Sequence, residues 1–280
     1  MKRKIFAVAA SVAALALSAC MLASCGGGSA APAEKEKLVV GFDAAYPPYG
    51  YLAVNGEEGY KADDGNTYTG FDLDLANEVC NMNNWELVVK PVDWDSKDAL
   101  LGSGDINCIW NGFTYEGRED QYAWSDKYMV NGQVVVVKKD SGINSLADLK
   151  GKIVMTQKES AALDVLEGDM KDLASTFKKL ETIGDYNNAF MQLESGAVDA
   201  VACDLSIAAY QTAADDGDFE QLEETLSSEH YAVGLAKGDE EKAKTITESL
   251  KKLDSEGKIE PLCEKYAVQG MDYANWCLGK

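Results

Sequence analysis

The stretch Asp105–Arg118, DINCIWNGFTYEGR, carries the two features around which we interpret the whole chain. Its first half is a short apolar run bounded by turn residues, which predicts a buried strand. Its second half is a polar turn, Asn111-Gly112-Phe113-Thr114, followed by Arg118. Backbone N–H groups, a hydroxyl and a bidentate guanidinium suit a planar carboxylate. The alternative is a surface arginine, and the spacing alone does not separate the two interpretations.

A second apolar run, Ala200–Asp204, also predicts a buried strand, and it ends in a carboxylate. One strand end would then hold an anion and the other a cation, as an α-amino acid ligand requires. The alternative is that Asp204 caps the helix that we predict over residues 205–213.

Three further segments place polar or aromatic side chains at the ends of predicted strands. Lys37–Phe42 runs into Asp43 and Tyr46, and ligands of open α/β sheets bind at such carboxyl ends. Trp94 follows the strand predicted over 86–92, and it is either a core residue or a stacking surface. Gln157–Ala161 is a turn before a helix, whose free N–H groups with the Ser160 hydroxyl form a second candidate anion site.

Strands and helices alternate along the chain, which predicts an α/β protein with mostly parallel sheets. Asp72 is expected to cap a helix over 72–80, and Ser145–Asp148 reads as a capping box. Two amphipathic helices are expected near the C-terminus, over about 239–255 and 258–267. Residues 50–67 read as a loop or hairpin.

The length of 280 residues fits one large or two modest domains. The formal net charge of −21 argues against a nucleic-acid partner and against a basic membrane-binding face. We expect a monomer.

The N-terminus reads as a targeting segment. A basic start is followed by the apolar run Ile5–Leu17, which is too short to span a membrane. Leu22-Ala23-Ser24-Cys25 resembles a bacterial lipobox, so residues 1–24 would be a lipoprotein signal peptide and Cys25 the lipidated residue. Cys20 is the alternative. Residues 25–36, rich in Gly, Ser and Ala, would be a flexible tether to a lipid anchor.

The sequence predicts no cofactor, no metal site and no catalytic residue. Its one histidine, His230, has no evident nucleophile partner, and no His/Cys cluster suggests zinc. Asp63–Asn66 lacks the alternating ligands of a calcium loop and reads as a turn. Cys263 and Cys277 could form a disulfide, which sequence alone does not establish.

The order of these segments resembles the solute-binding proteins of amino-acid ABC importers, bacterial family 3, which have the periplasmic-binding-protein type II fold. The resemblance covers about residues 37–270. The segments that carry it are VGFDAAYPPY (40–49), TGFDLDLANEV (69–79), VDWD (92–95), SDKYMVNGQVVVVKKDS (125–141), SLADLKGK (145–152), QLESGAVDAVACD (192–204) and YAVGLAKGDEE (231–241).

The resemblance implies two α/β lobes joined by a two-crossing hinge, with residues 37–132 and 231–280 in lobe 1 and 133–230 in lobe 2. A ligand would lie between the lobes, and closure would bury it. Arg118 would grip its α-carboxylate with help from Thr114 and Gly112. Ser160 and the N–H of Ala161 would contact the same carboxylate from lobe 2.

By the same resemblance, Asp204 would accept the α-ammonium, and Tyr46 and Trp94 would flank the ligand side chain. The positions that would set specificity are Asp43, Asn111 and Gln157. The chain departs from the family pattern in two places. The turn before Arg118 is one residue shorter than the common T-x-T-x-x-R, and Glu159 stands where Gly is common.

The implied function is an extracytoplasmic protein, lipid-anchored to the outer face of the cell membrane, that captures a polar or basic L-amino acid. It would deliver this amino acid to the permease and ATPase subunits of an ABC importer. One alternative is an enzyme that shares the fold, such as a cyclohexadienyl-type dehydratase. Another is a ligand-sensing ectodomain, which we expect less because no transmembrane or signalling segment follows the matched region.

Overall fold

The computed structural model describes residues 35–54, 56–214 and 217–279. The predicted signal peptide and both candidate lipidation cysteines, Cys20 and Cys25, lie outside these residues. Within them, no helix combines the length and apolar character that crossing a bilayer requires.

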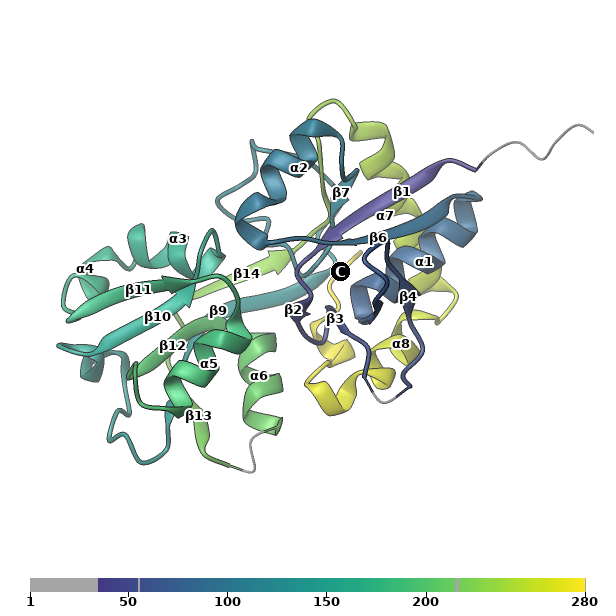
Figure 1. Ribbon diagram of the computed structural model, residues 1–280. Coiled ribbons are helices and arrows are strands. Elements are labelled where there is room, and N and C mark those ends of the chain that lie inside the picture. The colour runs from purple at the N-terminus through teal and green to yellow at the C-terminus, as the bar shows by residue number, and fades with distance from the viewer. Residues whose placement is uncertain (1–34, 55, 215–216, 280) are drawn as a thin grey trace, which may run out of the picture. The chain divides into compact units, whose positions relative to one another are not determined.

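The first of the two large sheets contains the N-terminal strand. β1 pairs in parallel with β6 and β7, and β15 lies antiparallel between β7 and β8. Its strands in spatial order are β6 (Glu86–Pro91), β1 (Lys37–Phe42), β7 (Cys108–Ile109), β15 (Gly234–Leu235) and β8 (Ala123–Trp124). The helices of this part are α1 (Phe71–Asn83), α2 (Lys97–Ser103), α7 (Glu240–Ser255) and α8 (Ile259–Lys265), as Figure 1 shows. Short 3₁₀ turns lie at Trp94–Ser96, Ala267–Gln269 and Tyr273–Asn275.

Most of a small antiparallel sheet is formed by the region around residues 50–67, which the sequence predicts as a loop or hairpin. Its strands in spatial order are β2 (Ala45–Tyr46), β3 (Gly50–Leu52), β5 (Thr67–Thr69) and β4 (Tyr60–Lys61). Because β2 follows directly after β1 and Asp43, this sheet holds Tyr46 beside the end of β1.

The second large sheet is formed by the middle of the chain. β10 pairs in parallel with β11 and β12, whereas β9 is antiparallel to β12, β13 and β14. Its strands are β11 (Lys179–Ile183), β10 (Ile153–Gln157), β12 (Ala200–Asp204), β9 (Met129–Lys138), β13 (Phe219–Gln221) and β14 (Ser227–Tyr231). Its helices are α3 (Ala161–Glu167), α4 (Lys171–Ala174), α5 (Tyr186–Glu194), α6 (Leu205–Ala214) and a 3₁₀ turn at Leu146–Leu149.

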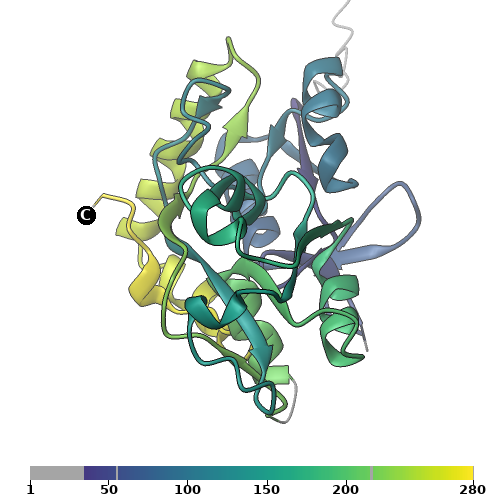
Figure 2. The same cartoon turned by 90° about the vertical axis from the view of Figure 1, so that its left-hand side faces the viewer.

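Two adjacent strands connect the two large sheets. β9 is ten residues long, and its first part, Met129–Gln133, pairs with β14. Its later part pairs with β12 and β13 in the second sheet. Figure 1 shows β9 and β14 side by side between the two parts, and Figure 2 shows the same strands in a view turned by 90°. The two predicted crossings are therefore one hydrogen-bonded ribbon.

The structure corrects two predicted helix caps. Asp72 does not cap α1, because it is the second residue of the helix, and its buried carboxylate accepts from the Gly112 N–H and the Tyr128 hydroxyl. Ser145 does not form a capping box, because its hydroxyl donates to the carboxylate of Asp148. The Asp72 side chain therefore bonds to residues distant in the sequence, whereas that of Ser145 bonds within its own turn.

Candidate functional site

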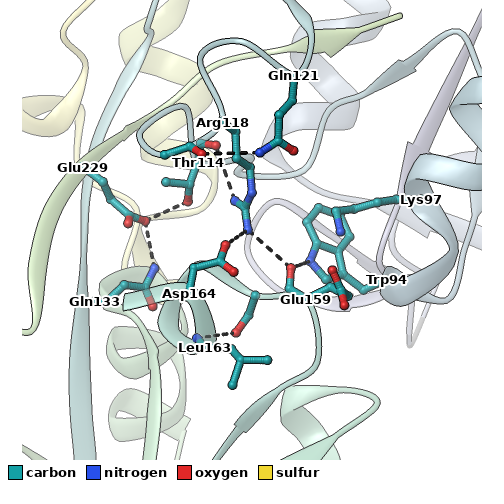
Figure 3. A network of polar contacts seen from close by, with 12 residues as sticks. Trp94, Lys97, Thr114, Arg118, Gln121, Gln133, Glu159, Leu163, Asp164 and Glu229 are labelled. Carbon is teal, nitrogen blue, oxygen red and sulfur yellow. Dashed lines mark hydrogen bonds and ion pairs between the residues drawn. The ribbon is translucent and has the colours of Figure 1, made fainter. Parts of the chain in front are cut away.

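Arg118 lies in the turn after β7 and reaches across to the second sheet. Its Nη2 lies 2.6 Å from Oδ2 of Asp164 on α3 and 3.4 Å from the carbonyl oxygen of Glu159. Its Nη1 donates to the Thr114 carbonyl at 3.5 Å. The arginine side chain is 8% exposed, whereas that of Asp164 is 63% exposed. Figure 3 shows the guanidinium pointing toward both partners. A buried cation is thus neutralised by a carboxylate that solvent reaches.

The turn before α3 supplies a second contact between the sheets. Glu159 has a φ of 53°, in the left-handed region, and its carbonyl accepts from Trp94 Nε1 at 3.2 Å as well as from Arg118. The next residue, Ser160, is the N-cap of α3, and its hydroxyl accepts from the Leu163 N–H. The left-handed conformation explains why a glycine would fit at position 159. The Glu159 residue is exposed.

Asp204 ends β12 in a buried position at the junction between the sheets. Its Oδ1 accepts from Gln133 Nε2 at 2.7 Å, from Asn131 Nδ2 at 2.9 Å and from the Tyr231 hydroxyl at 3.0 Å. The donors come from β9 and β14, the two connecting strands. Burial raises the pKa of this carboxyl group above its usual range. These three hydrogen bonds engage the Asp204 carboxylate, for which helix capping was the alternative prediction from the sequence.

A second buried carboxylate, Glu229 on β14, lies beside Asp204. Its Oε1 accepts from Asn131 Nδ2 at 2.7 Å, from Gln133 Nε2 at 2.8 Å and from the Thr114 hydroxyl at 2.8 Å. Burial, and then the charge of Asp204, raise its pKa to about 7. Figure 3 shows Thr114 and Gln133 on either side of Glu229.

A third buried carboxylate, Asp43, follows β1. Its Oδ2 accepts from Gln157 Nε2 of β10 at 2.6 Å, and its N–H donates to Asn111 Oδ1. Burial raises the pKa of Asp43 to about 6, and the charges of Asp185 and Asp93 act in the same direction. This contact again joins the two sheets.

The remaining predicted residues pack around these groups. Gly112 has a φ of 56°, and a Cβ there would lie 2.9 Å from the Tyr46 ring, so no larger residue fits. Its N–H is engaged by Asp72. The Tyr46 hydroxyl lies 2.9 Å from the Tyr231 hydroxyl. Ala161 begins α3 beside Ser160.

Two hollows lie between the sheets. One, of about 680 Å³, is lined by Thr114, Ala161, Asp164, Glu229 and neighbouring residues. The other, of about 720 Å³, is lined by Asp43, Trp94, Asp185 and neighbouring residues. Both are rich in carboxylates. Residues from both large sheets or their connections line each one.

The structure therefore brings most of the predicted site residues to the junction between the sheets. Sequence reasoning missed four polar groups there: Asn131, Gln133, Glu229 and Tyr231. All four lie on the connecting ribbon at alternate positions, Asn131 and Gln133 on β9 and Glu229 and Tyr231 on β14, and Glu229 lies opposite Asn131. A strand prediction over 227–231 would have signalled Glu229 and Tyr231, and one over 129–133 would have signalled Asn131 and Gln133. In this part of the chain the structure has two separate strands, β14 and β15.

Two other expectations concern metals and cysteines. No cluster of His, Cys, Asp and Glu among the described residues could hold a metal ion. Cys263 and Cys277 are not bridged to each other in the structure. His230, by its ring Nδ1, lies 2.9 Å from Glu116 Oε1, which also contacts Lys127.

Two α/β sheets joined by an antiparallel ribbon, with opposite charges buried at their junction, define a two-lobed binding protein. Comparison with known sequences and structures bears this out. Residues 38–269 match the model of the bacterial extracellular solute-binding proteins, family 3, and the chain belongs to that family.

Among curated relatives, a probable histidine-binding protein of Neisseria gonorrhoeae is 29% identical over 267 residues, covering 91% of this chain and 93% of the relative. The arginine-binding extracellular protein ArtP of Bacillus subtilis is 28% identical and covers 95% and 98%. A crystal structure of an ABC uptake transporter substrate-binding protein from Streptococcus pneumoniae with bound histidine is 30% identical. It superposes with a TM-score of 0.76 and covers 85% of this chain and 94% of that one. The predicted fold, two α/β lobes of the type II class, is confirmed, and these descriptions name binding proteins rather than enzymes.

Proposed function

We propose that this extracellular solute-binding protein captures a polar or basic L-amino acid between its lobes and delivers it to an ABC importer. The single observation that carries the proposal is the burial of one guanidinium and two carboxylates at the junction of the two sheets. A zwitterion removed from water needs both of its charges paired, or its desolvation is costly. Arg118 would pair with the ligand carboxylate, and Asp204 with its ammonium group.

The contacts at the junction support this assignment. The Thr114 hydroxyl bonds to Glu229, and the Thr114 carbonyl accepts from Arg118, so the two charged regions are linked through one residue. In the ligand complex, the carboxylate of the amino acid would replace that of Asp164 on Arg118. The hydroxyl of Ser160 and the N–H of Ala161 lie at the start of the same helix as Asp164 and would contact that carboxylate. The Gly112 N–H could donate to the ligand carboxylate only if its hydrogen bond to Asp72 broke.

The region around Asp43 would receive the ligand side chain. Asp43, Gln157 and Asn111 form one hydrogen-bonded group there, and Trp94 lines the same hollow. The hollow is also lined by Asp185 and other aspartates, which favours a cationic or amide side chain over an acidic one. Relatives named for histidine and arginine are consistent with this preference.

The proposal extends to the chain's organisation and location. Residues 37–132 with 231–280 would move as lobe 1 and residues 133–230 as lobe 2, with β9 and β14 as the hinge. Ligand contacts made only in the closed form would favour closure, and the closed form would be recognised by the permease. A lipid on Cys25 would anchor the protein, as a monomer, to the outer face of the membrane.

A thermal-shift panel of the twenty amino acids with cystine, ornithine and citrulline tests the function. A true ligand raises the melting temperature with the logarithm of its concentration well above the dissociation constant. We expect the largest shift from a basic or amide-bearing amino acid. A panel in which no amino acid raises the melting temperature contradicts the proposal.

A further inference from the structure

The two carboxylates at the junction share their hydrogen-bond donors. The side-chain amides of Asn131 and Gln133 each donate one N–H to Asp204 Oδ1 and one to Glu229 Oε1, at 2.7 to 2.9 Å. Both carboxylates are almost completely buried, Asp204 at 4% and Glu229 at 2% exposure. Each amide nitrogen must face the two acids, because an amide oxygen in its place would face acceptors only.

No cation of the described residues pairs with these two acids. The arginine at the junction, Arg118, bonds instead to Asp164. The titratable groups that face the pair from neighbouring elements are neutral near pH 7, because burial raises the pKa of each: Tyr46, Tyr49, Tyr186, Tyr231 and Cys203. The hollow that Glu229 lines adds only further acids: Glu116, Asp164, Glu167 and Asp169. The site therefore lacks a positive charge.

One more acceptor completes the group. The Gln133 side chain is fully buried, and its Oε1 has no hydrogen-bond partner among the described residues. An ammonium group carries three N–H donors. Asp204, Glu229 and Gln133 Oε1 together offer three acceptors, one for each N–H of an ammonium group. The carboxylates also supply the negative charge that an ammonium group needs nearby.

We infer that Glu229 is a second carboxylate of the ammonium site, and that it shares one proton with Asp204 until a ligand ammonium replaces that proton. The inference rests on the proposed function, because it assigns the ligand ammonium to this cluster. Two carboxylates that share donors in a buried site do not both ionise without a counter-charge. The proton goes to solvent when the ammonium enters, so binding is coupled to proton release.

The sign of the pH dependence follows from this exchange. The pKa of Glu229 is about 7 without a ligand, and a nearby ammonium lowers it. Affinity therefore rises as the pH increases toward about 7, by up to about tenfold per pH unit for one proton, and levels off above it. Burial also raises the pKa of Asp43, so a difference between variants is needed to isolate Glu229.

Calorimetric titration in buffers of different ionisation enthalpy counts the released protons. The probes are L-arginine and L-glutamine, because neither changes its charge between about pH 5.5 and 8. The rest of the amino-acid panel is used if neither binds. We expect wild type to release a substantial fraction of a proton near neutral pH. Glu229→Gln, which keeps the side-chain shape, should release less and show a flatter affinity profile. Glu220→Gln is the matched control, because Glu220 lies on β13, which also pairs with β9.

The outcomes separate this inference from the proposed function. Amino-acid binding with the same proton release in wild type and Glu229→Gln overturns the inference and leaves the function standing. Absence of binding to any amino acid overturns both. A folded Glu229→Gln protein is verified by its melting curve. The stability advantage of the variant over wild type should grow as the pH rises from about 4.5 to about 7 and then stay constant, because burial raises the pKa of Glu229 from its ordinary value of 4.5 to about 7.

Discussion

The two charged ends of the binding region are neutralised in different ways. At one end, Arg118 is buried and pairs with Asp164, whose side chain is mostly in solvent. At the other end, Asp204 and Glu229 are both buried and are held by amides and hydroxyls only. The cation has a counter-ion within the chain, and the anions have none among the described residues.

This difference has a physical consequence for each end. The Asp164 carboxylate can turn to solvent at modest cost, because its own side chain is 63% exposed. In the proposed complex, a ligand carboxylate would replace Asp164 on Arg118. The buried acids cannot turn to solvent, so only a proton or an incoming cation can neutralise them. We expect pH to change ligand affinity mainly through the titration of Asp204 and Glu229, and only weakly through Arg118 and Asp164.

The largest effect is expected from Arg118→Ala. Removing the guanidinium leaves a ligand carboxylate desolvated without a partner, which should weaken amino-acid binding by about 2–5 kcal/mol. Calorimetry with the best ligand of the panel measures the loss. Unchanged affinity would show that Arg118 does not bind the carboxylate.

The Asp204→Asn substitution should have two effects of opposite sign, one on ligand binding and one on stability. Ligand binding should weaken by about 2–5 kcal/mol, since the ammonium loses its charged partner. The ligand-free variant should gain stability relative to wild type as the pH rises above about 4, the usual pKa of an aspartate. The folded-state pKa of Asp204 is raised, so its ionisation costs stability as the pH rises, and asparagine removes that cost. Chemical denaturation of wild type and variant at several pH values tests this. A variant that is equally destabilised at every pH would contradict it.

The smallest effect is expected from Asp164→Asn. Removing the exposed partner of Arg118 frees the guanidinium for the ligand, so affinity should rise by no more than about 1 kcal/mol, roughly fivefold. The effect should shrink at high salt, because exposed charges are screened. Titrations at low and high ionic strength measure it. Weaker binding by Asp164→Asn would mean that Asp164 is itself part of the ligand site.

Local patterns predicted much of the framework. Lys37–Phe42 is a strand with the predicted bounds, and Ala200–Asp204 is a buried strand that ends in its carboxylate. Ser160 caps the helix expected after the turn. Each rests on hydrophobic period or cap chemistry within a few residues. Asp72 was misassigned because its partners, Gly112 and Tyr128, lie far along the chain. Ser145 was misassigned although its partner, Asp148, is only three residues away, because the two side chains bond to each other.

Local sequence patterns were sufficient to predict some of the strands, such as Lys37–Phe42 and Ala200–Asp204, and to place an arginine in the turn after one strand and an aspartate at the end of another. These follow from apolar spacing and from residue type, which act locally. Only the tertiary structure decided which groups neutralise one another. It placed Glu229 beside Asp204 and Asp164 beside Arg118, because strand register and the crossing of the ribbon bring together residues that no local pattern relates. Burial at that junction, rather than residue identity, raises the pKa values of its acids.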